Sequence, residues 1–148
     1  MENVPWRLIL YLSLAGLGLG SYLTVVTFVT ADLSYCEPHP LFSCDTVITS
    51  AYSRLLGVPV ALVGTLGFLG VFLIAYGGLI VGGDTRRRLA LLGLGMASAG
   101  LAFGTYLTYL ELFVIQSVCL LCLATFILMM PIVYLFLRVV GEERGRGA

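Results

Sequence analysis

Two long apolar stretches decide the fold, LALLGLGMASAGLAFGTYLTYL (89–110) and LFVIQSVCLLCLATFILMMPIVYLFL (112–137), with Glu111 as the single charged residue between them. A bilayer core about 30 Å thick is crossed by roughly 20 apolar residues in a helix, so each stretch can span once. Residues 8–31 and 55–83 form two further stretches without a charged residue. With 59% hydrophobic and 11% charged residues, the composition excludes an ordinary soluble domain.

These stretches predict an all-α integral membrane protein, a four-transmembrane-helix bundle that forms a single membrane domain over residues 1–148. The spans are expected at about 6–30, 56–82, 89–111 and 118–138. The first apolar stretch exceeds the hydrophobic region of a cleaved signal peptide, so we expect a retained helix. The last two spans predict a tight hairpin with Glu111 at the membrane interface. Small-xxx-small pairs, which allow close helix approach, occur at Gly16/Gly20, Gly78/Gly82 and Gly100/Gly104.

The arginines predict the orientation in the membrane. One side carries all but one of the eight basic residues: Arg7, Arg86, Arg87, Arg88, Arg138, Arg144 and Arg146, with Arg54 alone on the other. Short loops rich in basic residues stay in the cytoplasm, so both termini are predicted to be cytoplasmic. We therefore expect a multi-pass protein of the cell membrane with all four cysteines at the outer face, where disulfides are tolerated.

The outer loop, about 31–55, is predicted to contain a short amphipathic interfacial helix. Apolar residues recur at helical spacing from Cys44 to Leu56, while polar residues face the other way, and Ser43 is a suitable N-cap. This segment is too short and too polar to span, so we expect it to lie in the interface as a lid over the bundle. Cys44 falls on its apolar face, whereas Cys36 lies in a proline-rich stretch before it.

The second cysteine pair, Cys119-Leu-Leu-Cys122, falls at the start of the fourth span. Residues three apart share one face of a helix, so the two sulfurs are neighbours. The exposed amides of a helix N-terminus favour the thiolate, which is the attacking species in disulfide exchange. Ser117 could cap this helix. The pair is therefore predicted to be a reactive dithiol placed between the outer loop and the apolar interior.

Other interpretations compete with redox chemistry. A cysteine in an apolar chain is often only a small hydrophobic residue, and four cysteines can hold zinc or an iron–sulfur cluster. Cys36 and Cys44 lie eight apart rather than in a knuckle, which disfavours a metal, and no metal is predicted. We interpret His39 as a solvated loop residue. The alternatives for Glu111 are an interfacial helix end and a proton relay, and those for Tyr106 and Tyr109 are packing and quinone contact.

Taken together, these features resemble the vitamin K epoxide reductase family, and in particular its prokaryotic disulfide-bond-forming branch. The resemblance covers most of the chain. It depends on the four spans, the cysteine pair eight apart in the first outer loop, and the run Cys119-Leu-Leu-Cys122-Leu-Ala-Thr-Phe126 that opens the fourth span. The segment Gly57-Val-Pro-Val-Ala-Leu-Val-Gly64, which leads into span two, is also similar to the prokaryotic branch.

The resemblance implies a role for each cysteine. Cys119 and Cys122 would form the active-site disulfide, with Cys122 nearest the quinone and Cys119 attacked from the loop. Cys36 and Cys44 would be the shuttle pair, and Cys44 would bond transiently to Cys119. Two further positions would contribute to the quinone site: Ser50, at a Ser/Thr position that helps to orient the site in relatives, and Phe126.

The function expected from the resemblance is a thiol:quinone oxidoreductase that drives disulfide-bond formation. A reduced thioredoxin-like protein on the outer side, separate because this chain ends at Ala148, would supply the electrons. A quinone of the ubiquinone or menaquinone type would accept them, and no nucleic-acid partner is expected. Two alternatives remain, namely a vitamin K epoxide or quinone reductase and a non-enzymatic cysteine metal-binding membrane protein. Relatives that reduce vitamin K carry a tyrosine at the position of Phe126, which argues against epoxide reduction.

Overall fold

The computed structural model of the chain describes residues 3–29, 54–55 and 57–146. Its elements, in chain order, are the helix α1 (Val4–Val29), the short strands β1 (Arg54–Leu55) and β2 (Val58–Pro59), the helices α3 (Val60–Ile80) and α4 (Gly83–Leu110), the π-helical turn η3 (Glu111–Ile115) and the helix α5 (Leu120–Arg146). The predicted lid helix lies outside the described residues.

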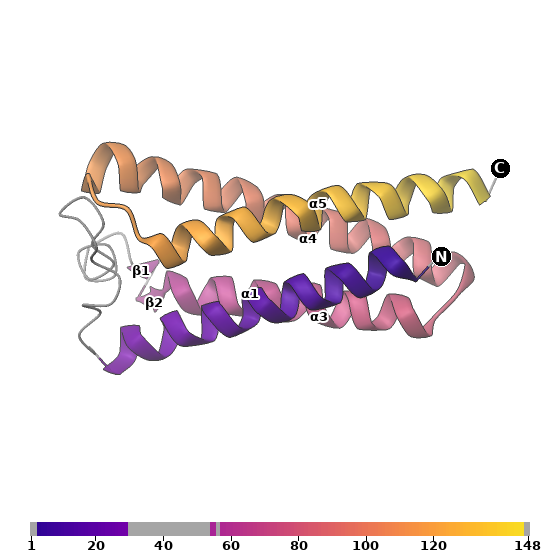
Figure 1. Ribbon diagram of the computed structural model, residues 1–148, viewed down its shortest axis with the longest axis horizontal. Helices are drawn as coiled ribbons and strands as arrows, with labels where there is room; N and C mark the ends of the chain where they lie inside the picture. The colour runs from indigo at the N-terminus through magenta and orange to yellow at the C-terminus, as the bar shows by residue number, and fades with distance from the viewer. Residues whose placement is uncertain (1–2, 30–53, 56, 147–148) are drawn as a thin grey trace.

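The four long helices form an up-and-down bundle (Figure 1). Helices α1 and α4 each lie against both α3 and α5, so every helix contacts two neighbours. All four are long and apolar enough to cross a membrane. This arrangement confirms the predicted four-helix membrane bundle. We call the end of the bundle where α1 ends and α5 begins the cysteine end, and the opposite end, where both chain termini lie, the terminal end (Figure 1).

The helices begin and end at different residues from the expected spans. Helix α3 starts at Val60 rather than near residue 56, because β1 and β2 pair antiparallel in front of it, with Gly57 at a positive φ of 87° in their turn. Proline at residue 59 also disfavours helical backbone at the residue before it. Helix α4 starts at Gly83 rather than near residue 89, and its first turn carries Asp84.

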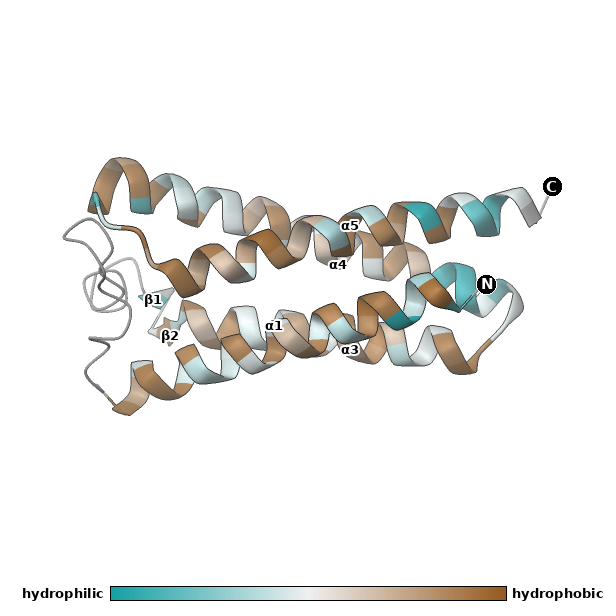
Figure 2. Cartoon of the chain, viewed as in Figure 1, coloured by the Kyte–Doolittle hydropathy of each residue, from teal (hydrophilic) through white to brown (hydrophobic). Residues whose placement is uncertain are grey.

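The arginines predicted between the second and third spans therefore lie in the first two turns of α4. An acidic residue in the first turn of a helix interacts favourably with the helix dipole. Asp84 also pairs with Arg88 one turn later, at 2.9 Å. Helix α5 similarly continues to Arg146, past the expected end near residue 138. Figure 2 shows the most hydrophilic residues gathered toward the terminal end.

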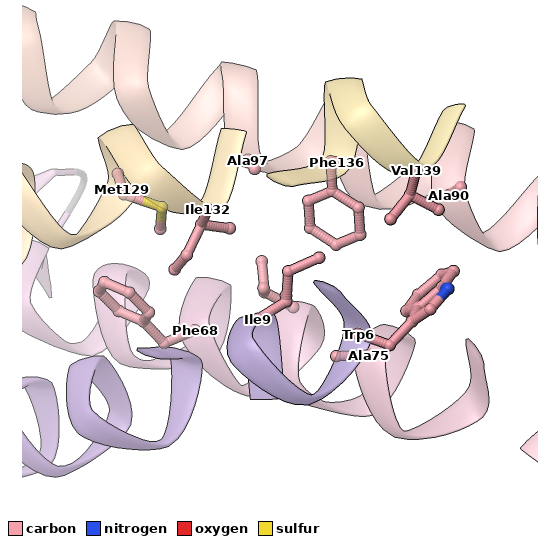
Figure 3. Close-up of a cluster of buried hydrophobic side chains, with 11 residues drawn as sticks. Trp6, Ile9, Phe68, Ala75, Ala90, Ala97, Met129, Ile132, Phe136 and Val139 are labelled. Atoms are coloured by element: carbon pink, nitrogen blue, oxygen red, sulfur yellow. The ribbon is translucent and has the colours of Figure 1, made fainter. Parts of the chain in front are cut away.

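The main core fills the half of the bundle nearer the terminal end. It contains side chains from all four helices: Trp6, Ile9, Phe68, Val71, Ala75, Ala90, Ala97, Met129, Ile132, Phe136 and Val139. The side chains labelled in Figure 3 point toward one another. Close packing requires glycine at some contacts. A Cβ at Gly78 would overlap the Trp6 ring, and one at Gly93 would overlap the Phe136 ring.

Two of the three predicted glycine pairs lie at helix contacts. Gly16 and Gly20 of α1 face Phe68 and Thr65 of α3, and Gly100 and Gly104 of α4 face Met129 and Phe126 of α5. In the third pair, Gly82 precedes α4 and a Cβ there would meet no atom within 4 Å. Glycines in a membrane helix thus mark some close contacts, since a missing side chain lets the facing helix approach.

A polar cluster joins three helices at the terminal end. Arg86 of α4 forms an ion pair with Glu143 of α5 at 3.4 Å and donates a hydrogen bond to the Asn3 side chain at 3.2 Å. Its guanidinium also lies over the ring of Trp6, 5.6 Å from the centroid. The Arg86 and Glu143 side chains are only 12% and 10% exposed, so most of this ion pair is removed from solvent.

Candidate active site

The half of the bundle nearer the cysteine end contains a partly open cavity of about 360 Å³. All four helices and η3 contribute to its wall, which is largely apolar. Glycines make up part of the wall, at Gly20, Gly64, Gly67, Gly100 and Gly104. Ligand pockets for small molecules are typically apolar, of about 300–1,000 Å³, with a few polar groups that fix orientation. The cavity is therefore large enough for an apolar ring compound.

Helix α5 presents one continuous face to this cavity. Its lining residues are Cys122, Thr125, Phe126 and Met129, which follow the helical spacing of three and four residues. Cys122 thus belongs to the largely apolar wall of this cavity. Phe126 stands one turn farther along and its ring lies against Gly104 of α4, so this residue sets the width of the cavity there.

Cys119 lies behind the cavity wall rather than in it. The residue is 0% exposed and packs with Leu23 and Val26 of α1. Its carbonyl oxygen accepts the amide of Leu123 at 2.9 Å, and its Sγ accepts the amide of Cys122 at 3.4 Å. Cys119 therefore occupies the capping position of α5, with one helix amide donating to its carbonyl oxygen and one to its sulfur.

This geometry confirms that the C-x-x-C segment opens the fourth helix. The predicted cap, Ser117, does not occupy the capping position, because α5 begins at Leu120 and Cys119 precedes it directly. Hydrogen bonds to an anionic acceptor are stronger than those to a neutral one. Consequently the amide of Cys122 stabilises negative charge on the Cys119 sulfur whenever a thiolate forms there.

Glu111 is the one acidic residue among the described residues that line the cavity. Its predicted place at the membrane interface stays a prediction; within the bundle its side chain is only 5% exposed. Its Oε2 accepts the amide of Cys119 at 3.4 Å, so the carboxyl group joins the end of the third span to the start of the fourth. The chain does not turn at Glu111, because η3 continues the helix to Ile115 before the link to α5.

A pattern in the sequence could have located Glu111 in the cavity. Gly100, Gly104, Leu107 and Glu111 recur at helical spacing, so they share one face of α4. The glycines of that face mark close approach to α5, which makes it an inward face. A carboxyl group on the same face must then lie inside the bundle.

The remaining predicted residues fall in two groups. Tyr106 and Tyr109 are each 55% exposed and do not line the cavity. The ring centroids of Tyr109 and Phe113 lie 4.9 Å apart on the outer surface of the bundle. The structure therefore favours packing over quinone contact for both tyrosines. Cys36, His39, Cys44 and Ser50 lie outside the described residues.

The fold and the site together define a multi-pass membrane protein of four helices, with a C-x-x-C pair at a largely apolar cavity. The chain belongs to the vitamin K epoxide reductase family, whose model matches residues 7–137 and so covers all four long helices. Members of this family are oxidoreductases that act with quinones or vitamin K.

Proposed function

We propose that the protein is a membrane thiol:quinone oxidoreductase that generates disulfide bonds. It would take two electrons from a reduced thioredoxin-like protein through Cys36 and Cys44. It would pass them to the Cys119–Cys122 disulfide and then to a quinone of the ubiquinone or menaquinone type. The single observation that carries this proposal is the division of positions in the C-x-x-C pair, with Cys122 in the cavity wall and Cys119 behind it.

This division matches the two exchange reactions that such an enzyme needs. A thiolate attacks one sulfur of a disulfide and releases the other. Attack by the Cys44 thiolate on Cys119 would form a Cys44–Cys119 bond and release Cys122 as a thiolate into the cavity. Attack by Cys36 on Cys44 would then restore the shuttle disulfide and leave Cys119 and Cys122 as the reduced pair.

The second half-reaction would regenerate the disulfide. Two electrons pass from the sulfurs of Cys119 and Cys122 to the quinone, a bond forms between the two sulfurs, and two protons convert the quinone to a quinol. The apolar wall around Cys122 suits this step because quinones partition into hydrocarbon. Cys122 and Phe126 would contact the quinone, with Ser50 contributing from the outer loop.

The direction of transfer follows from the proposed orientation. Basic residues gather toward the terminal end, and short basic loops face the cytoplasm. The cysteine end would then face the outer compartment, in which disulfides persist. Electrons would enter there from the partner and leave as quinol in the bilayer.

A second candidate function is reduction of vitamin K epoxide. Phe126 lines the cavity and has no hydroxyl group that could donate a hydrogen bond to an epoxide or carbonyl oxygen at that position. The site of this chain therefore favours an ordinary membrane quinone. The variant Phe126→Tyr would supply a hydroxyl at this position of the wall, and measurable epoxide reduction by the wild type would reverse the preference.

The proposal can be tested by following quinone reduction by ultraviolet absorbance. Purified protein in detergent is mixed with a reduced thioredoxin-like donor and a soluble quinone, and compared with Cys119→Ala and Cys122→Ala. We expect turnover by the wild type and none by either variant. An inactive wild type that retains zinc or iron after purification would instead support the metal-binding alternative.

A further variant tests the shuttle. Cys44→Ala should abolish oxidation of the protein donor but retain quinone reduction driven by a small dithiol, because a small molecule can reach the second pair directly. Loss of both activities to the same extent would contradict the shuttle assignment.

A further inference from the structure

The proposed quinone cavity contains a carboxyl group that takes no part in the thiol–disulfide exchange steps described above. Glu111 is 5% exposed and stands in a wall that is otherwise largely apolar. An ionisable side chain inside a membrane bundle is energetically costly and usually has a function. Capping α5 does not require an acid, since a neutral oxygen at the same position could also accept the hydrogen bond from the Cys119 amide.

The backbone holds Glu111 firmly in this position. The residue begins η3, and its carbonyl oxygen accepts the amides of both Gln116 and Ser117, the latter at 3.1 Å. Gln116 adopts a left-handed conformation, with φ of 56°, which closes the turn. π-Helical turns often occur at functional sites. Here the turn keeps the carboxyl group at the cavity wall, with its Oε2 3.4 Å from the amide nitrogen of Cys119.

Few other groups in the described part of the chain could exchange a proton with a cavity ligand. The lining residues of α1 and α3 carry no titratable side chain, and α4 with η3 contributes only Glu111. Helix α5 contributes Cys122, with Cys119 directly behind the wall. Glu111 and the cysteine pair therefore form one local group of titratable side chains.

We propose that Glu111 carries a proton from the cysteine thiols to the quinone, an inference that rests on the proposed function. In the balanced step, the two thiols and one quinone give one disulfide and one quinol. Two electrons move from sulfur to the quinone as the sulfur–sulfur bond forms. The Cys122 proton passes to the Glu111 carboxylate and on to one quinone oxygen. The second oxygen takes a proton from the outer aqueous phase, to which Cys119 releases its own.

The substitution Glu111→Gln separates proton transfer from positioning. Glutamine has nearly the same volume and retains an oxygen that accepts the Cys119 amide, but it cannot carry a proton. Glu111→Asp retains the acid on a shorter side chain. The matched control is Glu142→Gln, because Glu142 is an exposed carboxylate at the other end of α5.

Two rates are measured for each protein in detergent. The first is single-turnover reduction of a soluble quinone by the pre-reduced enzyme across a range of pH. The second is exchange of the Cys119–Cys122 disulfide with a small dithiol, which requires no quinone. Positioned acid–base groups typically contribute about 10²–10⁴-fold to a rate. Glu111→Gln should therefore slow quinone reduction by about 100-fold or more and change exchange by less than about 3-fold.

The pH profile and an infrared spectrum should both change if Glu111 carries a proton, and neither should change if its role is purely structural. The residual rate of Glu111→Gln should fall more steeply as pH rises than that of the wild type, because bulk protons must replace the internal carrier. Glu111→Asp should recover part of the rate, and Glu142→Gln should match the wild type. The infrared difference between oxidised and reduced wild type should contain a carboxyl band that Glu111→Gln lacks.

Each outcome bears on the proposal. Quinone reduction by Glu111→Gln within about 3-fold of the wild type at every pH would overturn it. So would equal slowing of exchange and quinone reduction, which would make Glu111 a positioning residue for the cysteine pair. An unchanged carboxyl band in Glu111→Gln would also overturn it. A wild type that exchanges thiols but reduces no quinone would instead refute the proposed function, and with it this step.

Discussion

Replacing Gly104 by alanine should narrow the cavity at a defined point. A Cβ built on Gly104 would lie 2.7 Å from Cδ2 of the Phe126 ring. Carbon atoms in contact prefer separations of about 3.5–4.0 Å, so the ring must retreat by about 1 Å. Because Gly104 lies on the backbone of α4 and Phe126 lines the cavity, the ring moves into the space proposed for the quinone.

The size of the effect follows from the cost of overpacking. Additional atoms in a well-packed site typically cost about 1–3 kcal/mol. If that free energy opposes quinone binding, KM for quinone should rise by about 5- to 150-fold, since every 1.4 kcal/mol corresponds to a factor of ten. A loss of binding shared by ground and transition states raises KM and leaves kcat largely unchanged. Exchange of the cysteine pair with a small dithiol should be unaffected.

The assay is steady-state quinone reduction at fixed donor concentration, with Gly95→Ala as the matched control. Gly95 lies on the same helix, and a Cβ there would meet no atom within 4 Å, so this variant should keep the wild-type KM. Phe126→Leu replaces the ring by a smaller side chain and so removes the overlap. In the Gly104→Ala background it should therefore restore quinone affinity, with a coupling energy between the two substitutions of about 1 kcal/mol or more. An unchanged KM in Gly104→Ala, or the same rise in Gly95→Ala, would refute this account of the cavity.

Two predictions concern stability and are measured by thermal or detergent-induced unfolding. Arg86→Met should lower the free energy of unfolding by about 3–5 kcal/mol, because it leaves the largely buried Glu143 carboxylate without this cation. Arg87 is exposed, so the control Arg87→Met should change the free energy of unfolding by less than about 0.5 kcal/mol. Equal effects of the two arginine variants would contradict a buried ion pair. The hydroxyls of Thr24 on α1 and Thr65 on α3 lie 3.0 Å apart, so Thr65→Val should cost about 0.6 kcal/mol, the average for a hydrogen bond between membrane helices. A loss above about 2 kcal/mol would show that Thr65 has a larger packing role.

Hydropathy alone could predict the four helices, because each apolar stretch is as long as the membrane requires and charges interrupt the chain between them. It could not predict where the helices begin and end. Asp84 and Arg88 form a surface ion pair that extends α4 beyond its apolar part, and Pro59 with Gly57 delays the start of α3. These boundaries depend on local backbone geometry and side-chain pairing. Hydropathy averaged along the chain contains neither kind of information.

The candidate site was predictable in part. The spacing of Cys119 and Cys122 in front of an apolar run predicted a pair at a helix start, and α5 begins at Leu120. The same spacing could not tell which of the two cysteines lines the cavity. One charge between two apolar stretches does not by itself place Glu111, although its helical spacing from Gly100 and Gly104 indicates the inward face of α4.

By itself, the sequence determined the number of spans, the helical position of the second cysteine pair and the asymmetry of the arginines. Tertiary structure decided which of the large apolar side chains point inward. Leu92 is 64% exposed whereas Ile132 is 0% exposed, although both are large aliphatic residues within spans. Lipid tails are as apolar as leucine, so a membrane helix gains nothing by separating lipid-facing from buried hydrophobic residues. The cavity, its carboxyl group and the contact of Phe126 with Gly104 therefore emerge only when the four helices pack together.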